Sequence, residues 1–197
     1  MQALLVVDAQ NEFSERGLRP VPGHSQAIAH IAALVEHVRH EQRPIAWIQH
    51  HNKPTESRAF VPGSWGAQLS PGFGPKADHG PEKLFQKDVF GAFTNTGLEQ
   101  WLRGLDVTEV LIAGFYAHMC LSTSAREALV RGFDVAVDFD GTGACDVAHA
   151  ALGSLSADEV RRTALLQLSH MGVTVLREGI PAIWHSAAES NALEHSR

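Results

Sequence analysis

The chain has few of the features that mark several classes of protein. Its 197 residues include only 2 cysteines, too few for a disulfide framework, which favours a reducing compartment. No basic run offsets the formal net charge of −6, which argues against nucleic acid and acidic membranes as partners. The N-terminal apolar run lacks a basic segment and is interrupted by Asp8, unlike a signal peptide or membrane span. We expect one globular, cytoplasmic domain over residues 1–197.

Several binding motifs are also missing. The sequence contains no GxGxxG after its first apolar run, no GxxxxGK[ST] and no GxSxG. This absence argues against a nucleotide-binding protein of the flavodoxin type. His50 and His51 would point to opposite sides of an extended chain, and with His79 they form no ligand pair of metal-site spacing. We therefore expect no metal and no cofactor, although these histidines are left open as metal ligands or pocket residues.

Short apolar runs alternate with amphipathic stretches along the chain. This alternation predicts a single-domain, three-layer α/β/α fold with a mainly parallel central sheet, of Rossmann-like form. Ser25 is the expected N-cap of the first helix, and Ser156 with Glu159 forms a capping box for the last one. Residues 50–93 are expected to be irregular. The expected strands are 3–7, 44–49, 109–113, 133–137 and 173–176, and the expected helices are 24–40, 95–105, 121–131 and 156–170.

Ligands of parallel sheets lie beyond the carboxyl ends of the strands, where Cys120 and Asp8 fall. Cys120 is expected in the first turn of a helix, where the helix dipole lowers a thiol pKa below about 8.5. The alternative is a buried, inert cysteine, as is also expected of Cys145. Asp8 either serves a function or caps the turn that follows it. Lys87 lies among aromatic residues and could equally be a solvated surface charge, and spacing alone does not bring the three residues together.

Three segments in this order resemble a known family. They are DAQNEF at 8–13, KDVFGAF at 87–93 and GFYAHMCLSTSAREA at 114–128. Together they resemble the isochorismatase-like superfamily of cysteine hydrolases, which includes nicotinamidases, N-carbamoylsarcosine amidases and isochorismatases. The likeness runs from Ala3 to about Leu176. The resemblance implies the isochorismatase-like hydrolase fold.

The resemblance also implies a site and a reaction. Asp8, Lys87 and Cys120 would form a catalytic triad, and a cis peptide at Phe115–Tyr116 would aim the amides of Tyr116 and Cys120 at one oxyanion. The implied reaction is metal-independent cleavage of a C–N bond of a small amide through a thioester. The alternatives are vinyl-ether or ester hydrolysis on the same scaffold, and a binding protein without catalysis.

The sequence departs from the family pattern at several positions. Ala117 stands where many relatives have threonine. The metal ligands of nicotinamidases correspond to Gln49, His51 and the region of Ser64, which disfavours a metal-dependent nicotinamidase. A small-molecule substrate and a homodimer or homotetramer are expected, with the apolar tail at 179–184 as a candidate contact. The expected substrate pocket is lined by Phe13, Trp65, Phe93, Tyr116 and His118.

Overall fold

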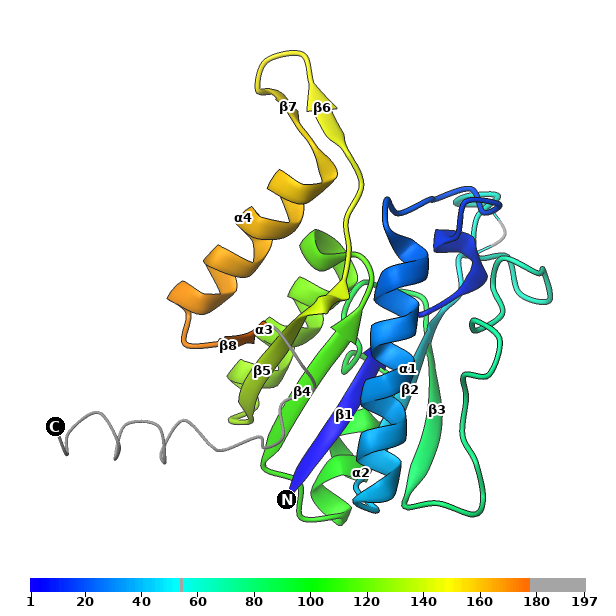
Figure 1. Ribbon diagram of the computed structural model, residues 1–197, viewed down its shortest axis with the longest axis vertical. Helices are drawn as coiled ribbons and strands as arrows, with labels where there is room; N and C mark the ends of the chain where they lie inside the picture. Colours follow the sequence, from blue (N-terminus) through cyan, green and yellow to red (C-terminus); the bar gives the residue numbers. More distant parts are fainter. Residues whose placement is uncertain (54, 178–197) are drawn as a thin grey trace, which may run out of the picture.

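A computed structural model describes residues 1–53 and 55–177, and the tail at 179–184 lies outside the described residues. Six parallel strands form one sheet in the order β3-β2-β1-β4-β5-β8 (Figure 1). Most of these strands are buried apolar runs, which is typical of a sheet covered on both faces. The six strands are β1 (Gln2–Val7), β2 (Ile45–His50), β3 (Glu82–Lys87), β4 (Glu109–Gly114), β5 (Asp134–Thr142) and β8 (Thr174–Leu176).

Helices cover both faces of the sheet. The side chains of β1 alternate between two apolar clusters, with Leu4 and Val6 in one and Leu5 and Val7 in the other. Helix α1 (His24–His40) packs on the first cluster, and α2 (Leu98–Gly104), α3 (Ser122–Val130) and α4 (Ala157–His170) supply the second. The predicted three-layer α/β/α architecture with a parallel sheet is therefore confirmed.

The structure corrects three local predictions. Strand β3 lies inside the stretch 50–93 that was expected to be irregular, because this edge strand is mostly polar and shows no apolar run. Helix α1 is capped by Gly23 in a left-handed conformation rather than by Ser25. Helix α2 begins at Leu98 rather than Asn95, since Asn95 and Gly97 both have positive φ angles and interrupt a helix there. The capping box of Ser156 and Glu159 is present as predicted.

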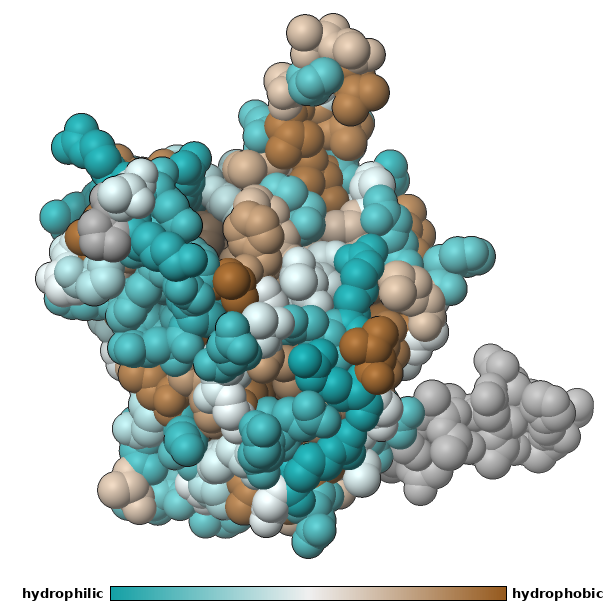
Figure 2. All heavy atoms as spheres, turned by 180° about the vertical axis from the view of Figure 1, so that it is seen from behind, coloured by the Kyte–Doolittle hydropathy of each residue, from teal (hydrophilic) through white to brown (hydrophobic). Residues whose placement is uncertain are grey.

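A two-stranded ribbon, β6 (Val147–His149) and β7 (Gly153–Leu155), extends beyond the body of the domain between β5 and α4 (Figure 1). Apolar side chains gather on it, as Figure 2 shows at the top of the molecule. Leu152 is 84% exposed, and Val147 and Leu155 are also exposed. Among the described residues, no helix combines the length and apolarity needed to cross a bilayer.

Gly114 ends β4 at the point where the chain turns toward Cys120. It pairs with Val7 of β1, and its φ of 122° is a conformation that side chains rarely adopt. A Cβ at this position would overlap the carbonyl oxygen of Val7, which accepts a hydrogen bond from the amide of Phe115 at 2.9 Å. Only glycine fits this junction between the strand and the site.

Replacing Gly114 with alanine is expected to lower the free energy of unfolding by about 3 kcal/mol or more, because the overlap is with backbone atoms. The matched control is Gly104→Ala. Gly104 lies in helix α2 with no atom within 4 Å of its would-be Cβ. Alanine there should raise stability by about 0.5–1 kcal/mol. Urea denaturation of both variants measures the difference, and equal effects would contradict the close approach at Gly114.

Candidate active site

The carboxyl ends of β1, β2 and β3 meet the turn that follows β4 (Figure 1). Asp8 directly follows β1, while His50 and Lys87 are the last residues of β2 and β3 and are paired in register. Cys120 lies in a π-helical turn, Ala117–Leu121, between β4 and α3. All four side chains are buried, although Asp8 and Lys87 are 79 residues apart in sequence. The sheet order thus brings the expected triad together, with His50 beside it.

Lys87 is the centre of a buried hydrogen-bond cluster. Its Nζ lies 2.8 Å from Oδ2 of Asp8, 3.2 Å from Nδ1 of His50 and 3.2 Å from the carbonyl oxygen of Val89. Three acceptors therefore face the three protons of an ammonium group. Burial disfavours this charge, but the interactions of the ammonium with Asp8 and with the sulfur of Cys120 outweigh it, so that the pKa of Lys87 is raised. Lys87 is thus a buried, charged group and not a solvated surface lysine.

Asp8 has one carboxylate oxygen engaged and one free of hydrogen bonds. Oδ2 accepts the proton of Lys87, whereas Oδ1 is buried and has no hydrogen-bond partner. A carboxylate oxygen of Asp8, a ring nitrogen of His50 and Sγ of Cys120 all lie within 4.8 Å of one another. The Asp8 side chain therefore does not cap the following turn. A buried acceptor without a donor is costly, which makes Oδ1 a ready base for a nearby proton.

The Cys120 thiol differs from its sequence-based expectation. Burial, followed by the neighbouring Asp8 carboxylate, raises the pKa of Cys120, and the opposing charge of Lys87 does not compensate. The expected lowering by a helix dipole is wrong, because burial disfavours the thiolate more than the short turn stabilises it. The neutral thiol is therefore the favoured form of Cys120, and attack by its sulfur would require a base to take the thiol proton.

The two charged neighbours should shift the thiol pKa in opposite directions. Asp8→Asn removes the negative charge that disfavours the thiolate, so the pKa of Cys120 should fall. Lys87→Met removes the ammonium that favours the thiolate, so the pKa should rise. The measurement is the rate of iodoacetamide alkylation against pH, in a Cys145→Ala background so that only Cys120 reacts. Shifts in the same direction would contradict this arrangement of charges.

The backbone that leads to Cys120 forms a tight turn over residues 115–119. The Phe115–Tyr116 peptide is cis. The Ala117 amide donates to the carbonyl oxygen of Gly143 at 2.8 Å, and the Met119 amide donates to that of Tyr116 at 3.0 Å. Among the described residues, no backbone hydrogen bond of a turn or loop uses the Tyr116 amide as donor. That amide is therefore available to a ligand.

A cavity of about 700 Å³ opens beside Cys120 and Asp8. Its aromatic wall is a stack in which Phe13 meets Tyr116 edge-on at 4.7 Å and Tyr116 stacks on His118 at 5.2 Å, both distances between ring centroids. Nδ1 of His118 is buried without a hydrogen-bond partner, and burial lowers the pKa of this imidazole. Further residues at the cavity are Arg19, His50, Asn52, Phe60, Phe90, Cys145 and Val147.

Two expected pocket residues lie elsewhere. Trp65 is 43% exposed, carries the guanidinium of Arg16 over its ring at 5.0 Å, and lines a separate hollow near α1. Phe93 is buried in the core, where its ring packs on Phe133 with centroids 5.8 Å apart. Sequence alone could not show which way these side chains point. Conversely, Cys145 was expected to be structural, yet it lines the cavity.

Two of the side chains considered as metal ligands, Gln49 and His79, contact other groups. The Gln49 amide donates to the carbonyl oxygen of Ala67 at 2.9 Å and accepts from Gln86 at 3.1 Å. His79 lies 3.8 Å from the exposed Asp78. Within the described parts of the chain, one group of three ligating side chains lies close together, that of Asp8, His50 and Cys120. The Lys87 ammonium already contacts two of them, so this cluster is built around a cation of the chain itself.

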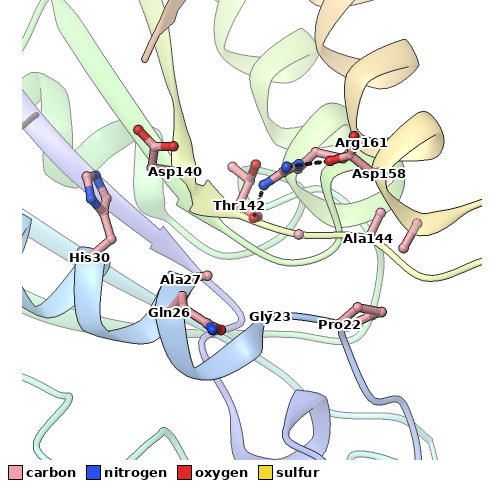
Figure 3. A pocket seen from close by; sticks show the side chains of 12 residues that line it. Pro22, Gly23, Gln26, Ala27, His30, Asp140, Thr142, Ala144, Asp158 and Arg161 are labelled. Atoms are coloured by element: carbon pink, nitrogen blue, oxygen red, sulfur yellow. Dashed lines mark hydrogen bonds and ion pairs between the residues drawn. The ribbon is translucent and has the colours of Figure 1, made fainter. Parts of the chain in front are cut away.

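A second cavity, of about 460 Å³, lies between α1 and the chain that joins β5 to α4 (Figure 3). Three of the ionisable side chains that line it, His30, Asp158 and Arg161, form ion pairs or hydrogen bonds. Arg161 lies 2.6 Å from Asp158 and 3.5 Å from the carbonyl oxygen of Thr142, and His30 reaches Asp138 at 3.1 Å. It contains none of the triad residues. The candidate catalytic residues therefore lie at the Cys120 cavity and not at this one.

The chain is similar to known proteins in sequence and in fold. The sequence matches the family model described as Isochorismatase domain over residues 2–178. The chain is 30% identical over 144 residues to the secreted isochorismatase effector of Verticillium dahliae, covering 73% of each protein. It is 27% identical over 150 residues to Nicotinamidase 3 of Arabidopsis thaliana, covering 71% of this chain and 72% of that protein. The crystal structure of an isochorismatase from Pseudomonas putida superposes with a TM-score of 0.81 at 26% identity, covering 89% and 87% of the two chains.

Proposed function

Because the chain belongs to the isochorismatase family, whose members are hydrolases, we propose that it cleaves a C–N bond of a small amide with Cys120 as nucleophile. The observation that carries the proposal is the buried Asp8 carboxylate close to the Cys120 thiol, with one of its oxygens held by Lys87 and the other without a hydrogen-bond partner. A base, a nucleophile and a fixed cation in one buried cluster suit covalent catalysis. The reaction needs no metal in this scheme.

The proposed reaction has two stages. Oδ1 of Asp8 takes the thiol proton as Sγ of Cys120 attacks the amide carbonyl, and the amides of Tyr116 and Cys120 receive the oxyanion. The C–N bond then breaks, and ammonia or an amine leaves with the proton held by Asp8. In the second stage Asp8 deprotonates a water that attacks the thioester, and the thiol regains its proton as the carboxylic acid is released. Lys87 stays charged throughout and keeps the carboxylate oriented.

The cavity favours a compact, flat substrate. Phe13, Tyr116 and His118 form an apolar wall at one side of the nucleophile. The unpartnered Nδ1 of His118 would meet a polar group of the substrate, since a buried nitrogen without a partner is unfavourable. One similar protein is named as a nicotinamidase, which agrees with a small aromatic amide as substrate class.

The test is a substrate panel with the purified protein. Small primary amides, aromatic amides and N-carbamoyl amines would be screened for release of ammonia or amine, beside simple esters and a vinyl ether. Cleavage of one or more amides with a clear preference over esters and the vinyl ether is the expected result. Preference for an ester or vinyl ether would replace the amidase proposal, and binding without turnover would indicate a non-catalytic member.

We also propose that the chain forms a homodimer or homotetramer through the apolar ribbon of β6 and β7. A two-stranded ribbon is marginally stable alone in water, and Val147 at its base also lines the Cys120 cavity. Leu152→Glu should therefore shift the protein toward the monomer in light scattering coupled to size exclusion. The matched control is Val130→Glu, which changes a residue of α3 that is 80% exposed. A monomeric parent chain, or an assembly indifferent to both changes, would contradict the proposal.

A further inference from the structure

His50 extends the hydrogen-bond cluster beyond the triad. Its Nδ1 lies 3.2 Å from Nζ of Lys87, and its Nε2 lies 2.8 Å from Oδ1 of Asn52. Asn52 in turn donates from Nδ2 to the carbonyl oxygen of Ala59 at 2.8 Å. The backbone of His50 is held from both sides by Gln10, which accepts from its amide at 2.8 Å and donates to its carbonyl at 2.9 Å. The imidazole is therefore held at both ring nitrogens, and the backbone of His50 is held by Gln10.

These contacts determine the state of the imidazole. An ammonium group only donates, so the Nδ1 that faces Lys87 must be unprotonated and must accept. The Nδ2 group of Asn52 is used by Ala59, which leaves its oxygen toward His50, and Nε2 must then carry the proton. The ring of Phe60 packs edge-on against the imidazole with centroids 5.3 Å apart. In this arrangement Nδ1 of His50 accepts from Lys87 and Nε2 donates to Asn52.

We propose that His50 is a positioning residue, which holds the Lys87 ammonium between Asp8 and Cys120 by presenting Nδ1 as its second side-chain acceptor. The inference rests on the proposed function and deepens it. Without this acceptor, Lys87 keeps Asp8 and the Val89 carbonyl but loses the contact that fixes its direction along the sheet edge. A carboxylate at position 50 would compete with Asp8 for the ammonium, whereas a neutral imidazole orients it and leaves the charge to Asp8.

Two amide substitutions test the roles of the two ring nitrogens of His50 one at a time. His50→Asn places its carbonyl oxygen near the position of Nδ1 and keeps an acceptor for Lys87. His50→Gln extends its amide toward the position of Nε2 and loses that acceptor. His51→Gln is the matched control, since the neighbouring side chain does not line the Cys120 cavity. Each variant would be made with Cys145→Ala, checked by thermal unfolding, and assayed for turnover and for iodoacetamide alkylation of Cys120 against pH.

The expected result is a contrast between the two variants. His50→Gln should slow alkylation at pH 8 by about tenfold, equal to a thiol pKa about one unit higher, because the ammonium no longer favours the thiolate fully. Its kcat should fall by about tenfold or more with KM nearly unchanged. His50→Asn should retain the parent alkylation profile within about twofold, as should His51→Gln.

Two results would overturn the assignment. One is an asparagine variant as impaired as the glutamine variant, and the other is a glutamine variant whose alkylation profile matches that of the parent. Alkylation needs no substrate, so the two proposals can fail separately. A shifted profile in His50→Gln supports the positioning role even if no amide is cleaved, and an unshifted profile rejects that role even if the amidase is active.

Discussion

Replacing Cys120 with alanine is expected to lower kcat/KM for the best amide by about 10⁴-fold or more, because it removes the proposed nucleophile that forms the covalent intermediate. Removal of a nucleophile leaves only the assistance given by substrate binding and by the oxyanion contacts. The structural effect should be small, since the substitution removes one buried sulfur at the edge of a cavity. Ammonia release under saturating and subsaturating amide measures both kinetic constants.

Two comparisons make this loss interpretable. Thermal unfolding of Cys120→Ala should remain cooperative, which separates loss of chemistry from loss of fold. Leu166→Ala, at a residue of α4 that is 61% exposed and does not line the cavity, should keep parent activity. Turnover by Cys120→Ala within tenfold of the parent would show that the cysteine is not the nucleophile.

Replacing Lys87 with methionine is expected to lower the free energy of unfolding by about 3–5 kcal/mol at neutral pH. The side chains of Asp8 and Lys87 are at most 1% exposed, so the substitution leaves an uncompensated carboxylate in the interior. The double variant Asp8→Asn/Lys87→Met removes both charges. It should recover stability to within about 1–2 kcal/mol of the parent, because no buried charge remains.

Among these variants of Asp8 and Lys87, turnover should not recover together with stability. The double variant regains a stable fold but lacks both the base and the cation, so its turnover should stay as low as that of Lys87→Met alone. Urea denaturation and amide turnover of the parent, both single variants and the double variant give the two cycles. Additive losses of stability would contradict a buried, coupled ion pair, and recovered turnover would contradict a chemical role for it.

Much of the fold could be predicted from the period of the apolar residues. The run at 3–7 and the repeat over 24–40 depend on local spacing, and both elements form close to where they were expected. Strand β3 could not be found in this way, because Phe85 is its one buried apolar residue. Its place is set by pairing with β2, a contact that local sequence does not contain.

The site was predictable only in part, for a similar reason. Asp8, Lys87 and Cys120 come from three separated segments, so the resemblance to a family and not their spacing suggested that they meet. The position of Cys120 after a strand was visible in the sequence, but the direction of its pKa shift depends on burial, which was not. His50 is the last residue of β2, and the sequence offered no signal that its Nδ1 would face Lys87.

The central claim is that Cys120 becomes acylated by an amide, and intact-mass spectrometry during turnover tests it most directly. The protein would be quenched in acid while hydrolysing its best amide, then digested to locate any added mass. The account predicts an added acyl group on Cys120 that hydroxylamine removes and that is absent from Cys120→Ala. Rapid release of ammonia with no acylated Cys120, or with the acyl group on Cys145 instead, would contradict it.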